Sequence, residues 1–355
     1  MKKITFFLLI CSLFFSCETE LNNFQTKNLS NAIVVYGEIT NQNGPYTVRL
    51  NRTSSYSPYD VTEFQGEVIK GASVSIVDGS GNVFPLTENR PGFYQTSPLF
   101  KGVFGQKYQL KIKNAAGNDI ESSFEELKSP TPLSEFSYKF ISADEVKDMR
   151  FDLKAAIKDS KETEDYYYIK RQDFIQFLTT CPEPPPPPAP VPVCYSKCWR
   201  APLNTQPILV NDFLINGKNI PIELGSVDLK DFPDWIVQLD VYSLSKETFN
   251  YWKRQEDQRV IGGGLFDKVP AQIVGNLKCT NNPNQEVLGI FLVAGVLKQR
   301  LTVDRFNSIS TEILQKVQNY ANFNNIRNKD AALWDCKNAG FIDYNIGYNL
   351  PPLLP

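Results

Sequence analysis

The chain has seven cysteines and 39 acidic residues but no histidine, and this inventory limits the chemistry open to it. Without histidine, Ser-His-Asp and Cys-His catalysis, the common zinc sites and a histidine pH switch are excluded. Catalysis by carboxylates, lysine or tyrosine stays open. The net charge of −2 provides no basic surplus to neutralise phosphates, so no nucleic-acid partner is expected. The cysteines and the acidic residues are therefore the candidates for catalytic, binding or modification sites.

Cys17 closes a short N-terminal segment with the three regions of an export signal: Lys2 and Lys3, the mostly apolar residues 4–15, and the small Ser16. The apolar stretch is shorter than the roughly 20 residues that a membrane span needs. The ending at residues 13–17 resembles the lipobox of bacterial lipoproteins, in which the signal is cut before the cysteine and the thiol is acylated. We therefore expect a signal peptide at 1–16, lipidation of Cys17 and a polar tether at 17–30. An ordinary secretory signal cut elsewhere is the alternative.

Five further cysteines favour disulfides in an exported chain, and their odd number leaves at least one thiol free or paired with another chain. They are Cys181, Cys194, Cys198, Cys279 and Cys336. The Cys194–Cys198 spacing resembles half of a metal site, but neither a second such pair nor a histidine accompanies it, so no metal is expected. The prolines between residues 182 and 192 form either a loop stapled by flanking cysteines or a polyproline II ligand for a partner's groove.

The acids offer two candidate sites. Asp60, Asp78 and Asn82 are possible calcium ligands, although Asp and Asn in such loops are typical of turn chemistry. A carboxylate-dependent glycan hydrolase would need two opposed carboxylates about 5–10 Å apart. An aromatic content of 12% and scattered acids such as Asp228, Asp231, Asp234 and Asp240 leave this role open. The glycine triplet at 262–264 lacks the following helix that a phosphate site needs, so no nucleotide cofactor is predicted. No residue is predicted to be catalytic, and no other cofactor is expected.

Residues 31–127 are predicted to form an immunoglobulin-like or transthyretin-like β-sandwich. Short alternating runs recur there about every 8–12 residues, separated by turn residues such as those at 78–82. The expected strands include 33–36, 46–50, 74–77, 83–86 and 108–112.

Pro130 and Pro132 mark a boundary, after which 133–355 is predicted to form a second β-rich domain with one or two short helices. Its Pro-rich, cysteine-bracketed loop lies at 181–198. The clearest strands are 149–154, 166–170, 235–242 and 288–296. Ser243 or Ser245 is predicted to cap a helix that runs to about Gln258, with Phe249 and Trp252 packing on the sheet.

Several stretches together resemble the family of Bacteroidota lipoproteins called domain of unknown function 4249 (DUF4249). They are the entry strand at 33–41, the Gly-Ala-Ser-Val-Ser-Ile-Val-Asp sequence at 71–78, the segment 266–276 and the Leu-Gly-Ile-Phe sequence at 288–291. The resemblance implies an outer-membrane lipoprotein, often encoded beside a TonB-dependent transporter of the starch-utilisation type. It implies no established reaction.

The expected function is therefore that of a non-catalytic, lipid-anchored binding or accessory component of an outer-membrane uptake system, with a TonB-dependent β-barrel transporter as the possible partner. The acidic Glu18 and Glu20 after Cys17 hint at exposure on the cell surface. Two alternatives stay open: the glycan hydrolase, and a surface adhesin or structural protein in which the sandwich is a spacer.

Overall fold

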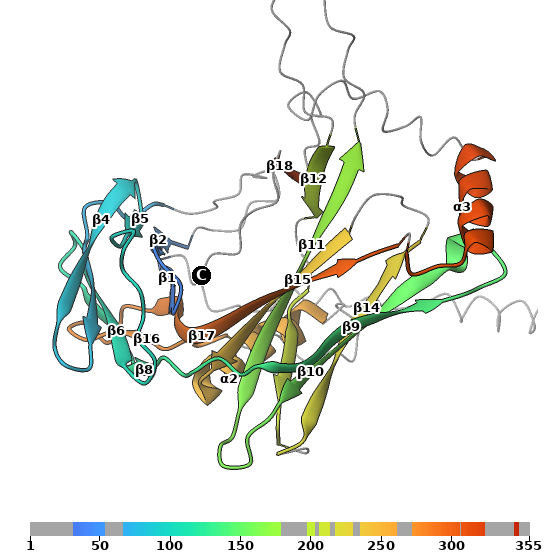
Figure 1. The fold of residues 1–355 in the computed structure, drawn as a ribbon. Helices are drawn as coiled ribbons and strands as arrows, with labels where there is room; N and C mark the ends of the chain where they lie inside the picture. Colours follow the sequence, from blue (N-terminus) through green and yellow to red (C-terminus); the bar gives the residue numbers. More distant parts are fainter. Residues whose placement is uncertain are drawn as a thin grey trace, which may run out of the picture.

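The computed structural model describes residues 31–53, 67–178, 197–202, 206–213, 217–229, 235–260, 272–305, 307–323 and 344–347. The fold is mainly β, as predicted, with a large curled sheet and a second, three-stranded sheet (Figure 1). The large sheet has the strand order β16-β7-β6-β3-β4-β5-β2-β1-β17-β15-β11-β12-β18. The small sheet has the order β14-β10-β9.

The elements of the N-terminal module precede the Pro130–Pro132 boundary. They are β1 (Ile33–Thr40), β2 (Thr47–Arg52), β3 (Ser73–Asp78), β4 (Val83–Arg90), β5 (Phe93–Gln95), β6 (Lys107–Lys113), β7 (Asp119–Ser122) and β8 (Glu125–Glu126).

The elements after the boundary are more varied in length and include two α-helices. They are β9 (Leu133–Ile141), the 3-10 helix η2 (Val146–Asp148), β10 (Arg150–Lys158), β11 (Tyr166–Leu178), β12 (Lys197–Pro202), β13 (Ile208–Asn211), β14 (Asn219–Asp228), β15 (Trp235–Leu244), α2 (Lys246–Val260), β16 (Leu277–Cys279), β17 (Val287–Val303), α3 (Thr311–Phe323) and β18 (Tyr344–Gly347).

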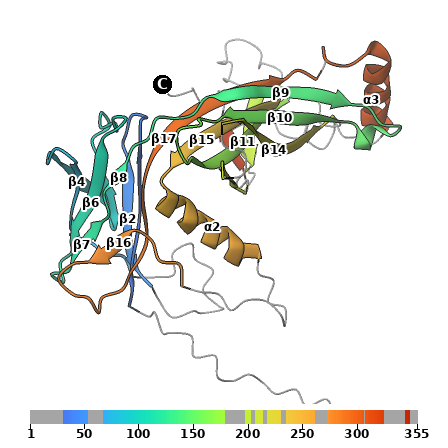
Figure 2. The same cartoon turned by 90° about the horizontal axis from the view of Figure 1, so that it is seen from below.

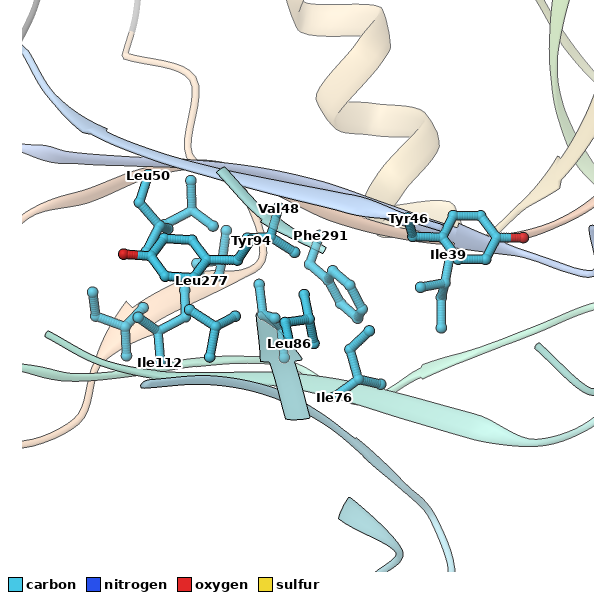
Figure 3. Packing of buried hydrophobic residues seen from close by; sticks show 14 of the residues in the cluster. Ile39, Tyr46, Val48, Leu50, Ile76, Leu86, Tyr94, Ile112, Leu277 and Phe291 are labelled. Carbon is cyan, nitrogen blue, oxygen red and sulfur yellow. The ribbon is translucent and has the colours of Figure 1, made fainter. Parts of the chain in front are cut away.

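The N-terminal module is a sandwich because the large sheet curls over on itself. Alternate residues of β1 and β2 point inward and meet those of β3 and β6, as the period of two along a strand dictates. The resulting core includes Val48, Leu50, Ile76, Ile112 and Phe291 (Figure 3). The predicted N-terminal sandwich is thus confirmed.

Two strands from late in the chain complete this N-terminal core. β16 pairs with β7, and the first half of β17 pairs in parallel with β1. Leu277 and Phe291 are accordingly part of the same buried cluster as Ile33 and Ile76. The sequence pattern assigned all residues after 133 to the second domain, whereas the fold uses 277–293 to close the first.

The second module has three layers (Figure 2). The continuation of the large sheet lies in the middle, with the small sheet on one face and α2 on the other. Consecutive residues of β11 serve the two faces: Tyr167 packs with Phe151 and Leu224 of the small sheet, whereas Tyr168 packs with Phe249 of α2. The 17-residue β17 crosses from one module to the other, so the two share a continuous strand.

The helix predicted after β15 is confirmed as α2. The Ser245 hydroxyl accepts a hydrogen bond from the Thr248 backbone amide at 3.2 Å, which is an N-cap contact. Phe249 is 3 % exposed, so it packs on the sheet as predicted. Helix α3 has no counterpart among the predicted elements, and its N-cap is Ser310, whose hydroxyl accepts from Ile313 N at 3.3 Å. Among the described residues, no helix is long and apolar enough to cross a membrane.

Candidate functional site

A group of aromatic side chains lies near the Glu38 carboxylate where the two modules meet. We call it the tyrosine cluster and define it as Tyr36, Glu38, Tyr168, Tyr242, Tyr251 and Trp252. Tyr36 and Glu38 lie two residues apart on β1, so they share the face opposite the buried Val35 and Ile39. The other members come from β11, β15 and α2, three elements that pack together only in the folded chain.

Ring contacts connect four members of the tyrosine cluster: Tyr168, Tyr242, Tyr251 and Trp252. The centroids of Tyr168 and Trp252 are 5.0 Å apart, and those of Tyr168 and Tyr242 are 5.7 Å apart in an edge-on arrangement. Lys170 Nζ lies 4.8 Å from the centroid of the Tyr242 ring and 3.4 Å from its hydroxyl oxygen. Trp252 therefore packs against an aromatic side chain of the sheet, as the sequence predicted. The cationic Lys170 lies against the Tyr242 ring, within the range of a cation–π contact.

Two polar atoms of the tyrosine cluster are buried without compensation. Glu38 Oε2 and Trp252 Nε1 are both shielded from solvent, and neither has a hydrogen-bond partner among the described residues. A buried acceptor or donor left unpaired costs about 1–3 kcal/mol, so each such group in a folded protein needs a structural or functional explanation. The rings of Tyr168, Tyr242, Tyr251 and Trp252 pack against one another.

Burial, with a smaller contribution from Glu38, raises the pKa of Tyr168 to about 12. The same two causes, in the same order, raise the pKa values of Tyr36 and Tyr242 above their ordinary value. An unfolded tyrosine ionises near pH 10. Between about pH 10 and 12 the unfolded chain has therefore lost protons that the folded protein keeps, and stability falls as the pH rises. Below pH 10 the contribution of these tyrosines is fully present.

We expect spectrophotometric titration at about 295 nm to show late-ionising tyrosines, with cooperative unfolding as the pH rises from about 10 to 12. Glu38→Gln removes the nearby negative charge, so the midpoint of the late ionisation should move to lower pH. Glu126→Gln, an exposed residue on β8, is the matched control and should leave the midpoint unchanged. Ionisation of every tyrosine near pH 10 in the folded protein would contradict the burial of the cluster.

Most of the cysteines singled out in the sequence lie beyond the structural description. Cys17, Cys181, Cys194 and Cys336 are outside the described residues, and Cys198 is described only through the backbone of β12. Cys279 is buried with a free thiol whose sulfur lies 3.3 Å from Asn281 Oδ1. A disulfide role for Cys279 therefore finds no support in this structure, and the other pairings stay predictions.

The acids proposed for hydrolysis are not brought together where they can be placed. Asp228 ends β14 of the small sheet, opposite Arg150, whereas Asp240 lies in β15 of the large sheet. The Asp240 carboxylate accepts a hydrogen bond from Gln238 Nε2 at 2.8 Å. Asp231 and Asp234 lie outside the described residues.

Asp78 serves the turn that the sequence predicted. One of its carboxylate oxygens accepts from the backbone amides of Ser80 and Asn82 at 2.9 Å, and the other from Asn82 Nδ2 at 2.8 Å. These internal bonds lower the pKa of the Asp78 carboxyl, and Asn82 contributes most. Asp60, the third residue considered with them, lies outside the described residues.

One acidic group in the described part of the chain has the spacing of metal ligands. Asp159, Asp165 and Asp212 each place a carboxylate oxygen within 4.8 Å of the others. The sequence expectation of no metal site did not consider these residues, because they are separated along the chain and belong to no motif. Asp159 and Asp165 share the β10–β11 connection, and the pairing of β11 with β13 brings Asp212 to them.

Comparisons with known proteins identify a family but no activity. The family model for the domain of unknown function DUF4249 matches residues 19–300. No curated protein matches the chain. Among solved structures, a DUF4785 family protein from Legionella pneumophila shares 11% identity with a TM-score of 0.21, covering 59% of this chain and 52% of that one. The chain thus spans about half of that protein.

Proposed function

Since the chain belongs to the DUF4249 family, which matches residues 19–300, we propose that it is an outer-membrane-anchored lipoprotein. In this proposal it acts as a non-catalytic binding or accessory component of a TonB-dependent nutrient uptake system, held beside its β-barrel transporter. The observation that carries the proposal is the lipobox-like ending at Cys17, which stands two residues before the family match begins.

The fold supports a role in binding. The tyrosine cluster gathers five aromatic rings and a buried carboxylate at the junction of the modules, and it includes polar atoms that a ligand or partner could satisfy. Its members come from both modules, because Tyr36 and Glu38 lie on β1 and the rest on β11, β15 and α2. A site of this kind is sensitive to how the modules pack, which suits an accessory subunit that responds to a partner.

The partner is tested by crosslinking the full-length protein in its native membrane, solubilising it in detergent and identifying what co-purifies by mass spectrometry. We expect a large β-barrel transporter in the crosslinked material. Recovery of the protein as a lone monomer from crosslinked native membranes would count against the uptake complex.

The anchor is tested by Cys17→Ala. We expect the variant to lose incorporation of labelled palmitate and to fall about tenfold in the outer-membrane fraction, because acyl chains supply the anchoring free energy. Cys11→Ala is the matched control, since it removes a thiol from the same signal and should retain both properties. A Cys17→Ala variant that still carries palmitate and fractionates with the outer membrane would refute lipidation at this residue.

A further inference from the structure

A group of three aspartates lies at one end of the second module, where its two sheets are connected. Asp159 follows β10 of the small sheet, and Asp165 precedes β11 of the large sheet. Asp212 follows β13, which pairs with the start of β11 in a register that places Asn211 opposite Tyr166. The β10–β11 connection, with two aspartates, and the segment after β13, with one, therefore bring three carboxylates to the same place, within 4.8 Å of one another.

The hydrogen bonds around these aspartates fix two of the three carboxylates. Asp159 Oδ2 accepts from the Gly217 backbone amide at 2.7 Å, and the Tyr167 hydroxyl lies 3.5 Å from Asp159 Oδ1. Asp165 Oδ2 accepts from the Thr163 hydroxyl at 2.8 Å. The Asp212 backbone amide donates to the Asp165 carbonyl oxygen at 3.3 Å, which holds the segment after β13 against the β10–β11 connection.

Asp212 itself lacks the compensation that a buried carboxylate requires. The residue is 2 % exposed, and its Oδ2 atom has no hydrogen-bond partner among the described residues. None of the ion pairs formed by described residues includes Asp159, Asp165 or Asp212. Burying an ionised carboxylate beside two others without a cation is strongly unfavourable.

We infer that Asp159, Asp165 and Asp212 form a binding site for a divalent cation and that calcium is the ion their donors suit. Calcium takes six to eight oxygen ligands in flexible geometries, and loop carboxylates, hydroxyls and water commonly supply them. Magnesium demands a near-ideal octahedron and dehydrates reluctantly, which three carboxylates from two loop segments do not favour. The absence of sulfur and histidine from the group argues against the softer transition metals.

Bound calcium would join the β10–β11 connection to the segment after β13, and so link the small sheet to the large one. This role is independent of the proposed uptake function. It would stabilise the second module in proportion to the free calcium concentration, because an ion that binds only the folded state shifts the unfolding equilibrium. Sites of this kind in extracellular modules bind calcium with a Kd on the order of 10⁻⁴–10⁻³ M.

The test uses the full-length lipoprotein in detergent after treatment with EGTA. Terbium is added as a luminescent calcium substitute, and Tyr167 should sensitise it because its hydroxyl lies beside Asp159. Calcium should displace the terbium signal and raise the Tm by roughly 5 °C at a hundredfold excess over the Kd.

Asp212→Asn should weaken calcium binding at least about tenfold and remove the calcium-dependent rise in Tm. In EGTA the variant should be as stable as the wild type or more stable, because it loses an uncompensated buried charge; a purely structural role for Asp212 would not predict this. Asp152→Asn on β10 is the control of equal charge change and should respond to calcium as the wild type does. If Asp212→Asn fails to fold, the less buried Asp165→Asn takes its place.

Two results would overturn the inference: no rise in Tm with calcium up to about 10 mM, or an equal rise in the wild type and both cluster variants. An equal response of the wild type to magnesium and calcium would overturn the assignment of calcium.

Discussion

Replacing Gly289 with alanine is expected to prevent stable folding. Gly289 lies in β17 opposite Val35 of β1, with a φ of +96°. A Cβ atom there would stand 1.9 Å from the Val35 carbonyl oxygen and 2.8 Å from its carbonyl carbon. Both are backbone atoms of a paired strand, so they cannot move aside without breaking the parallel pairing that joins the modules. The expected loss exceeds about 4 kcal/mol, and a positive φ adds its own cost.

The backbone of Gly275 packs against Gly289 at the same place in the fold, and even more closely. A Cβ on Gly275 would lie 1.6 Å from the Gly289 carbonyl oxygen, so the 272–276 segment, β17 and β1 are in backbone contact there.

The measurements that test the Gly289→Ala prediction are the soluble yield and Tm of this variant. Gly117→Ala is the control, because Gly117 also has a positive φ of +82° but nothing within 4 Å of its Cβ position. It should lose only about 1–2 kcal/mol. Equal losses in the two variants would show that the close approach to Val35 is unimportant.

Local elements were predictable from the sequence because neighbouring residues determine them. The Asp78 turn, the helix capped at Ser245 and the apolar strand at 288–296 all depend on residues within a few positions of one another. The partner of that strand was not predictable. β17 pairs with β1, although most of the chain separates the two strands in sequence. No local pattern specifies which strand a buried apolar run will pair with. For the same reason the sequence did not show that β16 and β17 close the N-terminal core.

The candidate sites were less predictable than the strands. The run at 166–168 indicated a strand, yet its alternation sends Tyr167 toward the small sheet and the aspartate group, and Tyr168 toward α2 and Glu38. Periodicity could have predicted that the two tyrosines face opposite sides. It could not have shown that Glu38 or Asp212 joins them, because each lies on a segment brought close only by the sheet order.

Phe291→Ala is expected to destabilise both modules together by about 3–5 kcal/mol, the usual cost of removing a buried phenylalanine ring. Phe291 is fully buried in the N-terminal core, and its backbone is held by Asn276, which donates to the Phe291 oxygen at 2.8 Å and accepts from its amide at 2.9 Å. The next residue along β17, Leu292, faces the α2 core on the other side of the sheet. Loss of the ring therefore loosens a strand that both modules need.

Because both modules share β17, we expect them to unfold cooperatively. Denaturant unfolding of Phe291→Ala should remain a single transition at a lower midpoint, with hydrogen exchange accelerated in β3 and β6 and also in β11 and β15. Phe124→Ala is the matched control, since its ring is 47 % exposed and its loss should cost about 1 kcal/mol. If protection fell only in β3 and β6, the modules would unfold independently and β17 would not couple them. If it falls in both, β17 joins the two cores energetically as well as by pairing, because it pairs with β1 of one module and β15 of the other.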